Sequence, residues 1–162
     1  MESSSSMVKE KSSSTRIYDE EGFKRRAACI CVKSEAEDEV LLISSGSKPG
    51  IWKVPGGGVE PGEDPSDAAA REVMEEAGVL GNVGRSLGVF ENPDRKERTE
   101  VFVMIVKKEL EDWDEAKTRN RKRQWFSMEE AIEQVALYKP LQRNYLQQLC
   151  LSRAPKKLIQ TL

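Results

Sequence analysis

The chain has no histidine among its 162 residues. This absence excludes Ser-His and Cys-His nucleophilic catalysis, and it excludes any zinc site that depends on a histidine ligand. General acid and base chemistry would therefore fall to carboxylates. Their pKa values would be set by neighbouring carboxylates and by a bound metal ion.

Cysteine is also scarce, and the three positions are Cys29, Cys31 and Cys150. An odd number of cysteines, with no metal-site spacing and no secretory signal ahead of them, favours reduced thiols. No apolar run approaches the length needed to span a bilayer, and a net charge of −2 provides no overall attraction to nucleic acid or membranes. We expect a monomeric cytoplasmic protein without a membrane partner, and nuclear residence stays open.

The length suits one domain with a sizeable core. Residues 1–14 are serine-rich and poor in large apolar side chains, so we expect a disordered tail there. Residues 15–150 should form the domain, and residues 151–162 a flexible C-terminal tail.

A strand is predicted over residues 24–33, in which Cys29 and Cys31 face one side and Ala28, Ile30 and Val32 the other. A strand that is apolar on both faces is typical of the middle of a sheet. Patterning also predicts the following elements: strands over 39–44, 84–91, 98–107 and 121–127, irregular chain over 109–120, and helices starting after Ser127 and at Pro140. The expected fold class is α/β (α+β), a sandwich of sheet and helices.

A further helix is predicted over residues 65–77. Asp64 followed by Pro65 is a helix start, since Asp can accept the free N–H groups of the first turn and Pro tolerates the first helical position. Gly78 suits the position just past the helix end. Small apolar side chains recur every four residues and would let the helix sit close to a sheet, at Ala69, Val73 and Ala77.

Another face of this helix carries Glu72, Glu75 and Glu76 within about one turn. Three crowded carboxylates repel one another, and Mg²⁺ commonly binds through a few carboxylates together with phosphates and water. The glycine run at 56–58 can bring backbone close to the same ion. An isolated E-x-x-E-E is more often a solvated acidic face. The choice between a metal site and a solvated face therefore depends on the surrounding sequence.

That surrounding sequence fits a longer pattern from Gly57 to Val79, G-x5-E-x7-R-E-U-x-E-E-x-G-U, in which U is a bulky aliphatic residue and every specified position is filled. This pattern is the Nudix box, so the chain resembles the Nudix hydrolases. The resemblance implies the Nudix fold, a mixed sheet between helices, and cleavage of a diphosphate assisted by Mg²⁺, with Mn²⁺ or another divalent cation as a substitute.

Carried over by motif position, the resemblance implies that Glu72, Glu76 and the Gly56 carbonyl are metal ligands. It also implies that Glu75 is the base or a carboxylate that organises the metal. Glu63 and Arg71 would brace the loop against the helix through a charge-assisted pair, although a phosphate-binding role for Arg71 remains an alternative.

Stretches outside the box resemble one subfamily, the diphosphoinositol polyphosphate phosphohydrolases, from about Thr15 to Leu149. Among them are TRIYDEEGFKRRAACICV, LGVFENPDRKERTEVFVMIV and NRKRQWF. This likeness implies removal of the β-phosphate of inositol pyrophosphates and cleavage of diadenosine polyphosphates, with inorganic polyphosphate or capped RNA as substrates of some members. The phosphate-binding positions it implies are Arg16, Lys24, Arg25, Arg26, Ser45, Gly46, Arg95, Lys96, Arg121 and Lys139.

The chain departs from the subfamily pattern in two places. Ser47 and Lys48 stand where relatives often have arginine, and Glu97 stands where histidine is common. Both departures lower the local positive charge, which bears on the preference among polyphosphates.

Two alternatives remain open at this stage. A nucleotide-directed Nudix pyrophosphatase, acting on dinucleoside polyphosphates or an RNA cap, would need a ring that stacks on a base; the candidate rings are Trp52, Phe90, Trp125 and Tyr138. A catalytically silent module could instead bind polyphosphates through the same basic residues. Nucleic acid other than capped RNA is not expected.

Overall fold

The computed structural model describes residues 17–46 and 49–153. The predictions for Arg16, for Ser47 and Lys48, for the tail over 1–14 and for most of the tail over 151–162 lie outside these residues.

The sheet is built around β1 (Lys24–Val32), which is its central strand. β1 pairs in parallel with β6 (Glu97–Glu109) and antiparallel with β2 (Glu39–Ser44) and β4 (Gly56–Gly58). The sheet is therefore mixed, and the predicted central position of this strand is confirmed.

The remaining strands extend the sheet on both sides. β5 (Val79–Asn92) runs antiparallel to β6 and forms a hairpin with it. β3 (Trp52–Lys53) and β7 (Arg123–Ser127) both pair antiparallel with β2. Strands far apart in the chain are thus joined into one sheet.

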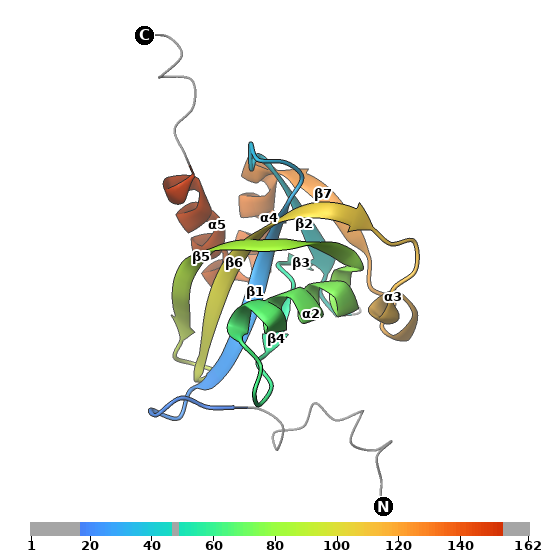
Figure 1. The fold of residues 1–162 in the computed structure, drawn as a ribbon. Helices are drawn as coiled ribbons and strands as arrows, with labels where there is room; N and C mark the ends of the chain where they lie inside the picture. Colours follow the sequence, from blue (N-terminus) through green and yellow to red (C-terminus); the bar gives the residue numbers. More distant parts are fainter. Residues whose placement is uncertain (1–16, 47–48, 154–162) are drawn as a thin grey trace, which may run out of the picture.

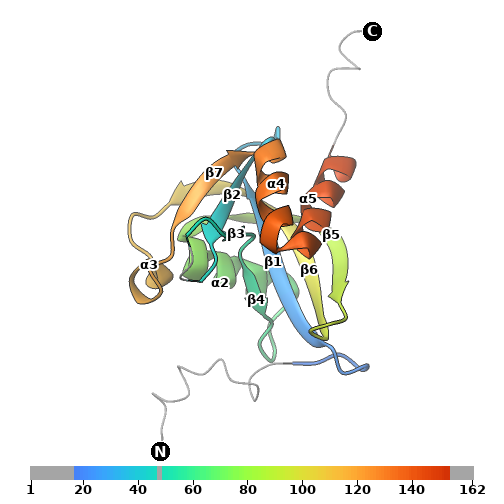
Figure 2. The same ribbon diagram turned by 180° about the vertical axis from the view of Figure 1, so that it is seen from behind.

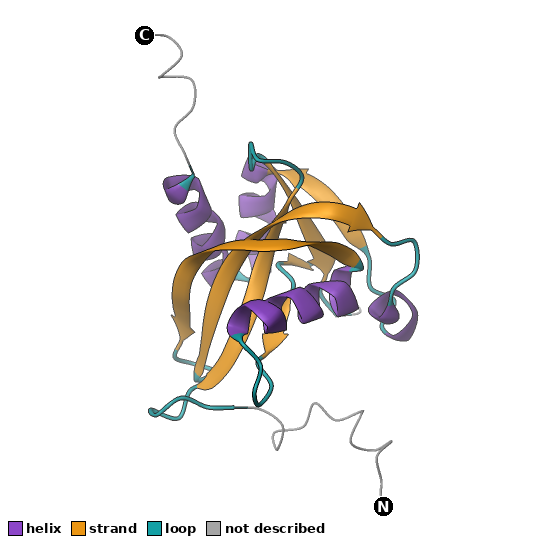
Figure 3. Cartoon of the chain, viewed as in Figure 1, coloured by secondary structure: helices purple, strands orange, loops and turns teal. Residues whose placement is uncertain are grey.

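Helices lie on both faces of the sheet (Figures 1 and 2). α2 (Pro65–Ala77) crosses one face, while α4 (Met128–Tyr138) and α5 (Pro140–Ser152) pack together on the other. The short α3 (Asp114–Thr118) lies beside the C-terminal end of α2 (Figure 3). The predicted sandwich of sheet and helices is confirmed.

β1 supplies side chains to a separate core on each face. Cys29 and Cys31 pack in the core beneath α2, whereas Ile30 and Val32 pack in the core beneath α4 and α5. Burial raises the pKa of the Cys29 thiol to about 12 and also raises the pKa of Cys31. Both thiols therefore serve as small apolar side chains.

α2 covers the predicted residues, but one of its ends differs from the prediction. Gly78 has a φ of 66° and donates its N–H to the carbonyls of Val73 and Met74, which ends the helix in the expected way. Asp64 makes no side-chain capping bond. Instead its main-chain carbonyl accepts from Ala68 N at 2.9 Å. The capping box at Ser127 and Glu130 is confirmed.

The region between α2 and β7 is more regular than predicted. β5 starts at Val79, directly after the helix end, β6 continues to Glu109, and α3 follows. The strand predicted from the sequence begins only at residue 84. In the structure a Cβ at Gly81 would overlap the Ile105 carbonyl, so glycine lets the two strands approach closely at a bulge.

Candidate active site

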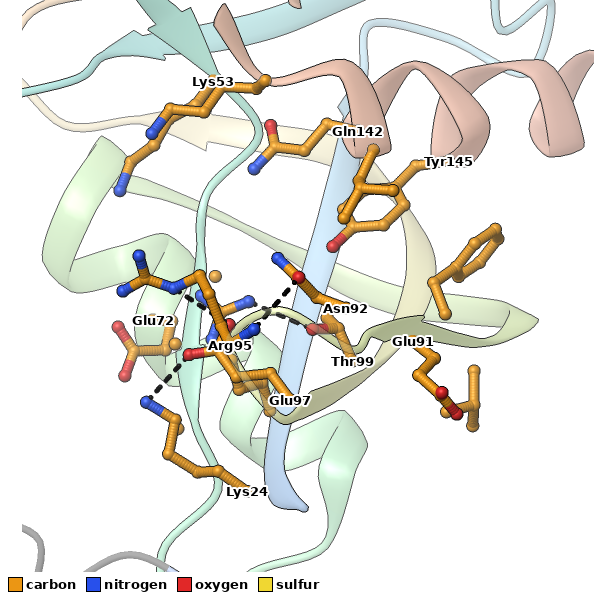
Figure 4. A pocket seen from close by; sticks show the side chains of 18 of the residues that line it. Lys24, Lys53, Glu72, Glu91, Asn92, Arg95, Glu97, Thr99, Gln142 and Tyr145 are labelled. Atoms are coloured by element: carbon orange, nitrogen blue, oxygen red, sulfur yellow. Dashed lines mark hydrogen bonds and ion pairs between the residues drawn. The ribbon is translucent and has the colours of Figure 1, made fainter.

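A cavity of about 1180 Å³ opens at the end of the sheet where α2, the β5–β6 turn and the start of α5 come together. Lys24 and Arg26 reach it from β1, the glycines of β4 form part of its wall, and Glu72 and Glu76 reach it from α2. Figure 4 shows Gln142 and Tyr145 of α5 on the side of the cavity away from Lys24.

The two α2 carboxylates are nearly inaccessible to solvent, with residue exposures of 3% for Glu72 and 7% for Glu76. Gly56 N donates to Glu76 Oε1 at 2.9 Å. Burial raises the pKa of Glu76 to about 7; the positive charge of Lys53 opposes this shift, and the negative charge of Glu72 adds to it. Glu76 is thus a buried carboxylate whose negative charge is stabilised by a nearby cation.

The carboxylates also lie close to the glycine backbone. A Cβ at Gly57 would overlap the carboxyl carbon of Glu72, so only glycine leaves room for that carboxylate against β4. Within the described ranges, no group of three or more Asp, Glu or Cys side chains is arranged to hold a metal ion. The implied set of Glu72, Glu76 and a main-chain carbonyl needs only two side chains. Its all-oxygen chemistry fits a hard divalent cation.

Arg71 joins the loop before α2 to the helix. Its Nε donates to Glu63 Oε2 at 2.8 Å and its Nη2 donates to Glu63 Oε1 at 3.0 Å. Nη2 also donates to the Gly58 carbonyl, and Nη1 donates to Glu72 Oε2, both at 3.0 Å. The hydrogen bonds to Glu63 are the main cause that raises the pKa of the guanidinium, and the negative charges of Glu72, Glu63 and Glu60 add to the rise. With its donors used in this way, Arg71 holds Glu72 in place.

Glu75 lies beside this network rather than in the cavity wall. It does not line the cavity, and its Oε1 is 3.6 Å from Arg71 Nη1. The same arginine therefore touches Glu75 and Glu72 together.

The structure divides the implied phosphate-binding positions into two groups. Four of them line the cavity: Lys24, Arg26, Arg95 and Lys139. Five described positions do not: Arg25, Ser45, Gly46, Lys96 and Arg121.

Two residues of the second group make contacts within the protein. Arg121 is buried, and its guanidinium donates to the Ser44 carbonyl at 2.6 Å and to Glu115 Oε1 at 2.8 Å. It therefore ties the end of β2 to α3. Lys96 lies in the turn between β5 and β6, with its ammonium 5.2 Å from the centre of the Phe23 ring.

Lys53 lines the cavity although the subfamily resemblance did not include it. Burial lowers its pKa, Glu76 opposes that shift, and the positive charges of Arg121, Arg26 and Lys139 lower it further. Several cations are thus close enough to repel one another, as expected of a site for a polyanion. The place of Lys53 in the sequence was a signal for this role, because Lys53 lies only three residues before Gly56. Arg119 also lines the cavity, and the subfamily resemblance did not include it either.

The cavity wall carries carboxylates as well as cations. Its acidic residues are Glu60, Glu72, Glu76, Glu91, Asp94, Glu97 and Glu115, and its cationic residues are Lys24, Arg26, Lys53, Arg95, Arg119 and Lys139. One of these carboxylates forms an ion pair with a cation of the wall: Glu97, at the start of β6, lies 3.1 Å from Lys24 Nζ. The distribution of charge, rather than its total, determines where phosphate can bind.

The structure also divides the candidate base-stacking rings into those that line the cavity and those that pack elsewhere. Phe90 and Tyr138 line the cavity, and Phe90 packs on Tyr145 with ring centroids 4.9 Å apart. Trp52 packs edge-on against Phe126, and Trp125 lies under the ammonium of Lys33. Leu141 of α5 is partly exposed and also lines the cavity.

Comparisons with known proteins agree with this geometry. Residues 23–149 match the model of the NUDIX domain. The chain is 56% identical over 148 residues to diphosphoinositol polyphosphate phosphohydrolase 2 of Rattus norvegicus, covering 91% of this chain and 83% of the relative. It is 55% identical to the Homo sapiens protein of the same name, covering 92% and 83%. To diphosphoinositol polyphosphate phosphohydrolase 3-alpha of Mus musculus it is 56% identical, covering 91% of both chains.

Among solved structures, the solution structure of the E. coli ORF135 protein superimposes with a TM-score of 0.60 at 22% identity, covering 82% of this chain and 94% of that one. This likeness supports the fold. In the part of the chain that the structure describes, no helix has the length and apolar character needed to cross a membrane. On the match to the domain model and to these relatives, the chain belongs to the Nudix hydrolase family.

Proposed function

We propose that the protein is a metal-dependent phosphohydrolase that cleaves the diphosphate of diphosphoinositol polyphosphates, releases phosphate, and also cleaves diadenosine polyphosphates. The names of the similar proteins support this substrate class. The observation that carries it is a single cavity in which two buried carboxylates of α2 face a group of cations, Arg26, Lys53 and Lys139. Such a cavity can hold a phosphate chain by its charge while a reaction takes place at one end.

Glu72, Glu76 and the Gly56 carbonyl would hold a divalent cation, with Mg²⁺ as the proposed metal. When bound, such a cation would neutralise the diphosphate and lower the pKa of a water molecule. The cationic side chains would bind the non-reacting phosphates and orient the diphosphate, since charge-assisted hydrogen bonds to phosphate oxygens are strong and directional.

Glu75 would take the proton from the attacking water, either directly or through the carboxylates next to it. Its contact with Arg71, 3.6 Å from Nη1, places it beside the group that also orients Glu72. A shift of Glu75 toward the cavity on ligand binding is part of this proposal, because active-site hydrogen bonds of an apo enzyme often tighten only in the complex.

The test is phosphate release from a diphosphoinositol polyphosphate, with Mg²⁺ and with chelator, and with diadenosine hexaphosphate as the parallel substrate. Glu75→Gln should lower turnover by about 10²–10⁴, the usual contribution of a general base. Glu133→Gln, on an exposed position of α4, makes the same charge change away from the cavity and should leave turnover unchanged. Near-normal turnover in Glu75→Gln would remove that residue from the reaction.

A nucleotide substrate is the second candidate, and the aromatic side of the cavity favours it. Tyr138 is largely exposed and lines the cavity, as do Phe90 and Tyr145, so a base could stack on its ring. Tyr138→Ala should then raise KM for diadenosine hexaphosphate and leave KM for the inositol substrate unchanged. An equal effect on both substrates would count against a base-binding role.

If neither compound is cleaved at any metal concentration while both bind, a silent polyphosphate-binding module is the better description.

A further inference from the structure

Glu97 is an acidic residue in the part of the cavity wall where cations are expected to meet phosphate. It is the first residue of β6 and lies directly across from Lys24 on the parallel strand β1. Its Oε2 is 3.1 Å from Lys24 Nζ, and its Oε1 is 3.7 Å from Arg95 Nε. Figure 4 shows Lys24 and Glu97 pointing toward each other, with Arg95 beside them.

The two contacts differ in strength because they differ in exposure. The side chains of Lys24 and Glu97 are only 18% and 13% exposed, so water screens their attraction little. The side chain of Arg95 is 72% exposed, and its ion pair is correspondingly weak. Glu97 therefore holds Lys24 firmly and Arg95 loosely.

The backbone keeps this carboxylate in the wall. Glu97 pairs with Lys24 on β1 and with Asn92 on β5, so a strand lies on each side of it. The turn immediately before it contains Lys96 with a φ of 52°. A ligand can draw Arg95 away with little resistance, but the negative charge of Glu97 stays close to any phosphate that reaches Lys24.

We propose that Glu97 determines specificity by competing with ligand phosphates for Lys24 and Arg95. The carboxylate lowers the affinity of the cavity for the most highly phosphorylated ligands, and the loss grows with the ligand's charge. The identity of the ligand class depends on the proposed function, whereas the competition itself does not require hydrolysis.

The experiment compares wild type with Glu97→Gln, which removes the charge and keeps the shape. Binding of inositol hexakisphosphate, which has no diphosphate to cleave, and of inorganic tripolyphosphate is measured by calorimetry at low and at physiological salt. Removing one like charge next to a bound phosphate should tighten inositol hexakisphosphate about tenfold. Tripolyphosphate should gain less, and both gains should shrink as salt rises.

Glu133→Gln on α4 is the matched control and should change either affinity less than twofold. Unfolding temperatures of all three proteins check that the fold is kept. Weaker binding by Glu97→Gln would show that Glu97 positions Lys24 for the ligand, which would overturn the proposal. Unchanged binding, or no binding by any variant, would overturn it as well.

Hydrolysis is measured separately, so the two proposals can fail independently. If wild type cleaves a diphosphoinositol polyphosphate but Glu97→Gln binds no tighter, only the competition is wrong. If wild type cleaves nothing but Glu97→Gln gains affinity for polyphosphates, the competition stands and the proposed reaction is wrong.

Discussion

At the scale of single residues, Gly57 and Gly58 are neighbours in β4 with different surroundings. A Cβ on Gly57 would overlap the buried carboxyl group of Glu72, while a Cβ on Gly58 meets nothing within 4 Å. We expect Gly57→Ala to displace Glu72 and lower turnover by at least about tenfold, since small displacements at a reacting centre are costly. The measurement is metal-dependent phosphate release.

Gly58→Ala is the control for that substitution. It adds the same methyl group to the same strand where no atom lies within 4 Å, so turnover and unfolding temperature should fall much less than in Gly57→Ala. Equal turnover in the two variants would mean that the close approach of β4 to Glu72 is not needed for the reaction.

The raised pKa of Glu76 predicts that the stability of the metal-free protein depends on pH. Its pKa is raised from 4.5 to about 7, mainly by burial, so the folded state favours the protonated carboxyl. The stability contributed by this proton is fully present below about pH 4.5 and is lost as pH rises through about 7. Glu76→Gln is neutral at all pH values and can still accept from Gly56 N.

In chelator, Glu76→Gln should therefore be more stable than wild type at pH 8, by about 3 kcal/mol for a shift of this size, and about equally stable at pH 4.5. Urea unfolding of both proteins across this range gives the difference. A difference that does not change with pH would mean that the Glu76 carboxylate is already compensated in the folded protein.

At the scale of elements, α2 is the part that both the sequence and the structure describe most fully. Its bounds, its glycine end and its buried apolar stripe were predictable because each depends on neighbours in the chain. The anchoring of its C-terminal end was not predictable. Trp113 Nε1 donates to the Glu76 carbonyl at 2.8 Å, and Arg123 donates to the Ala77 carbonyl at 2.8 Å. Both come from segments that only the folded chain brings near.

This anchoring predicts the effect of replacing the helix-ending glycine. Gly78 has a φ of 66°, and a Cβ there would lie 2.6 Å from Trp113 Cγ. Gly78→Ala should cost about 1–3 kcal/mol of unfolding free energy, from backbone strain and from displacement of the tryptophan. It should also weaken activity, because Trp113 holds the turn that carries Glu76. Urea unfolding and phosphate release measure the two effects.

Gly62→Ala separates the cost of backbone strain from the cost of displacing Trp113. Gly62 has a φ of 77°, but nothing lies within 4 Å of its Cβ position, so that variant carries strain alone. If both variants lose the same stability, the contact with Trp113 contributes nothing beyond strain.

At the scale of the whole molecule, the cavity is lined by residues of β1, β3, β4, the β5–β6 hairpin and the helices α2, α3, α4 and α5. The order of the elements could be predicted, but the register that sets Lys24 against Glu97 across two parallel strands could not. The same limit explains why Arg121 was grouped with the phosphate-binding residues although it is buried against Glu115. Charge in a sequence shows which side chains can bind an anion, whereas packing decides which of them face it.

Metal binding should stabilise the whole molecule, because a cation held by Glu72 and Glu76 compensates two carboxylates buried between the sheet and α2. At a Mg²⁺ concentration one hundred times its Kd, binding to the folded state alone contributes about 2.7 kcal/mol. That corresponds to a rise in Tm of roughly 5–10 °C for a domain of this size. Calorimetric scans in Mg²⁺ and in chelator, at equal ionic strength, measure the shift. The double variant Glu72→Gln, Glu76→Gln should show no shift; a wild-type shift in that variant would place the stabilising cation elsewhere on the protein.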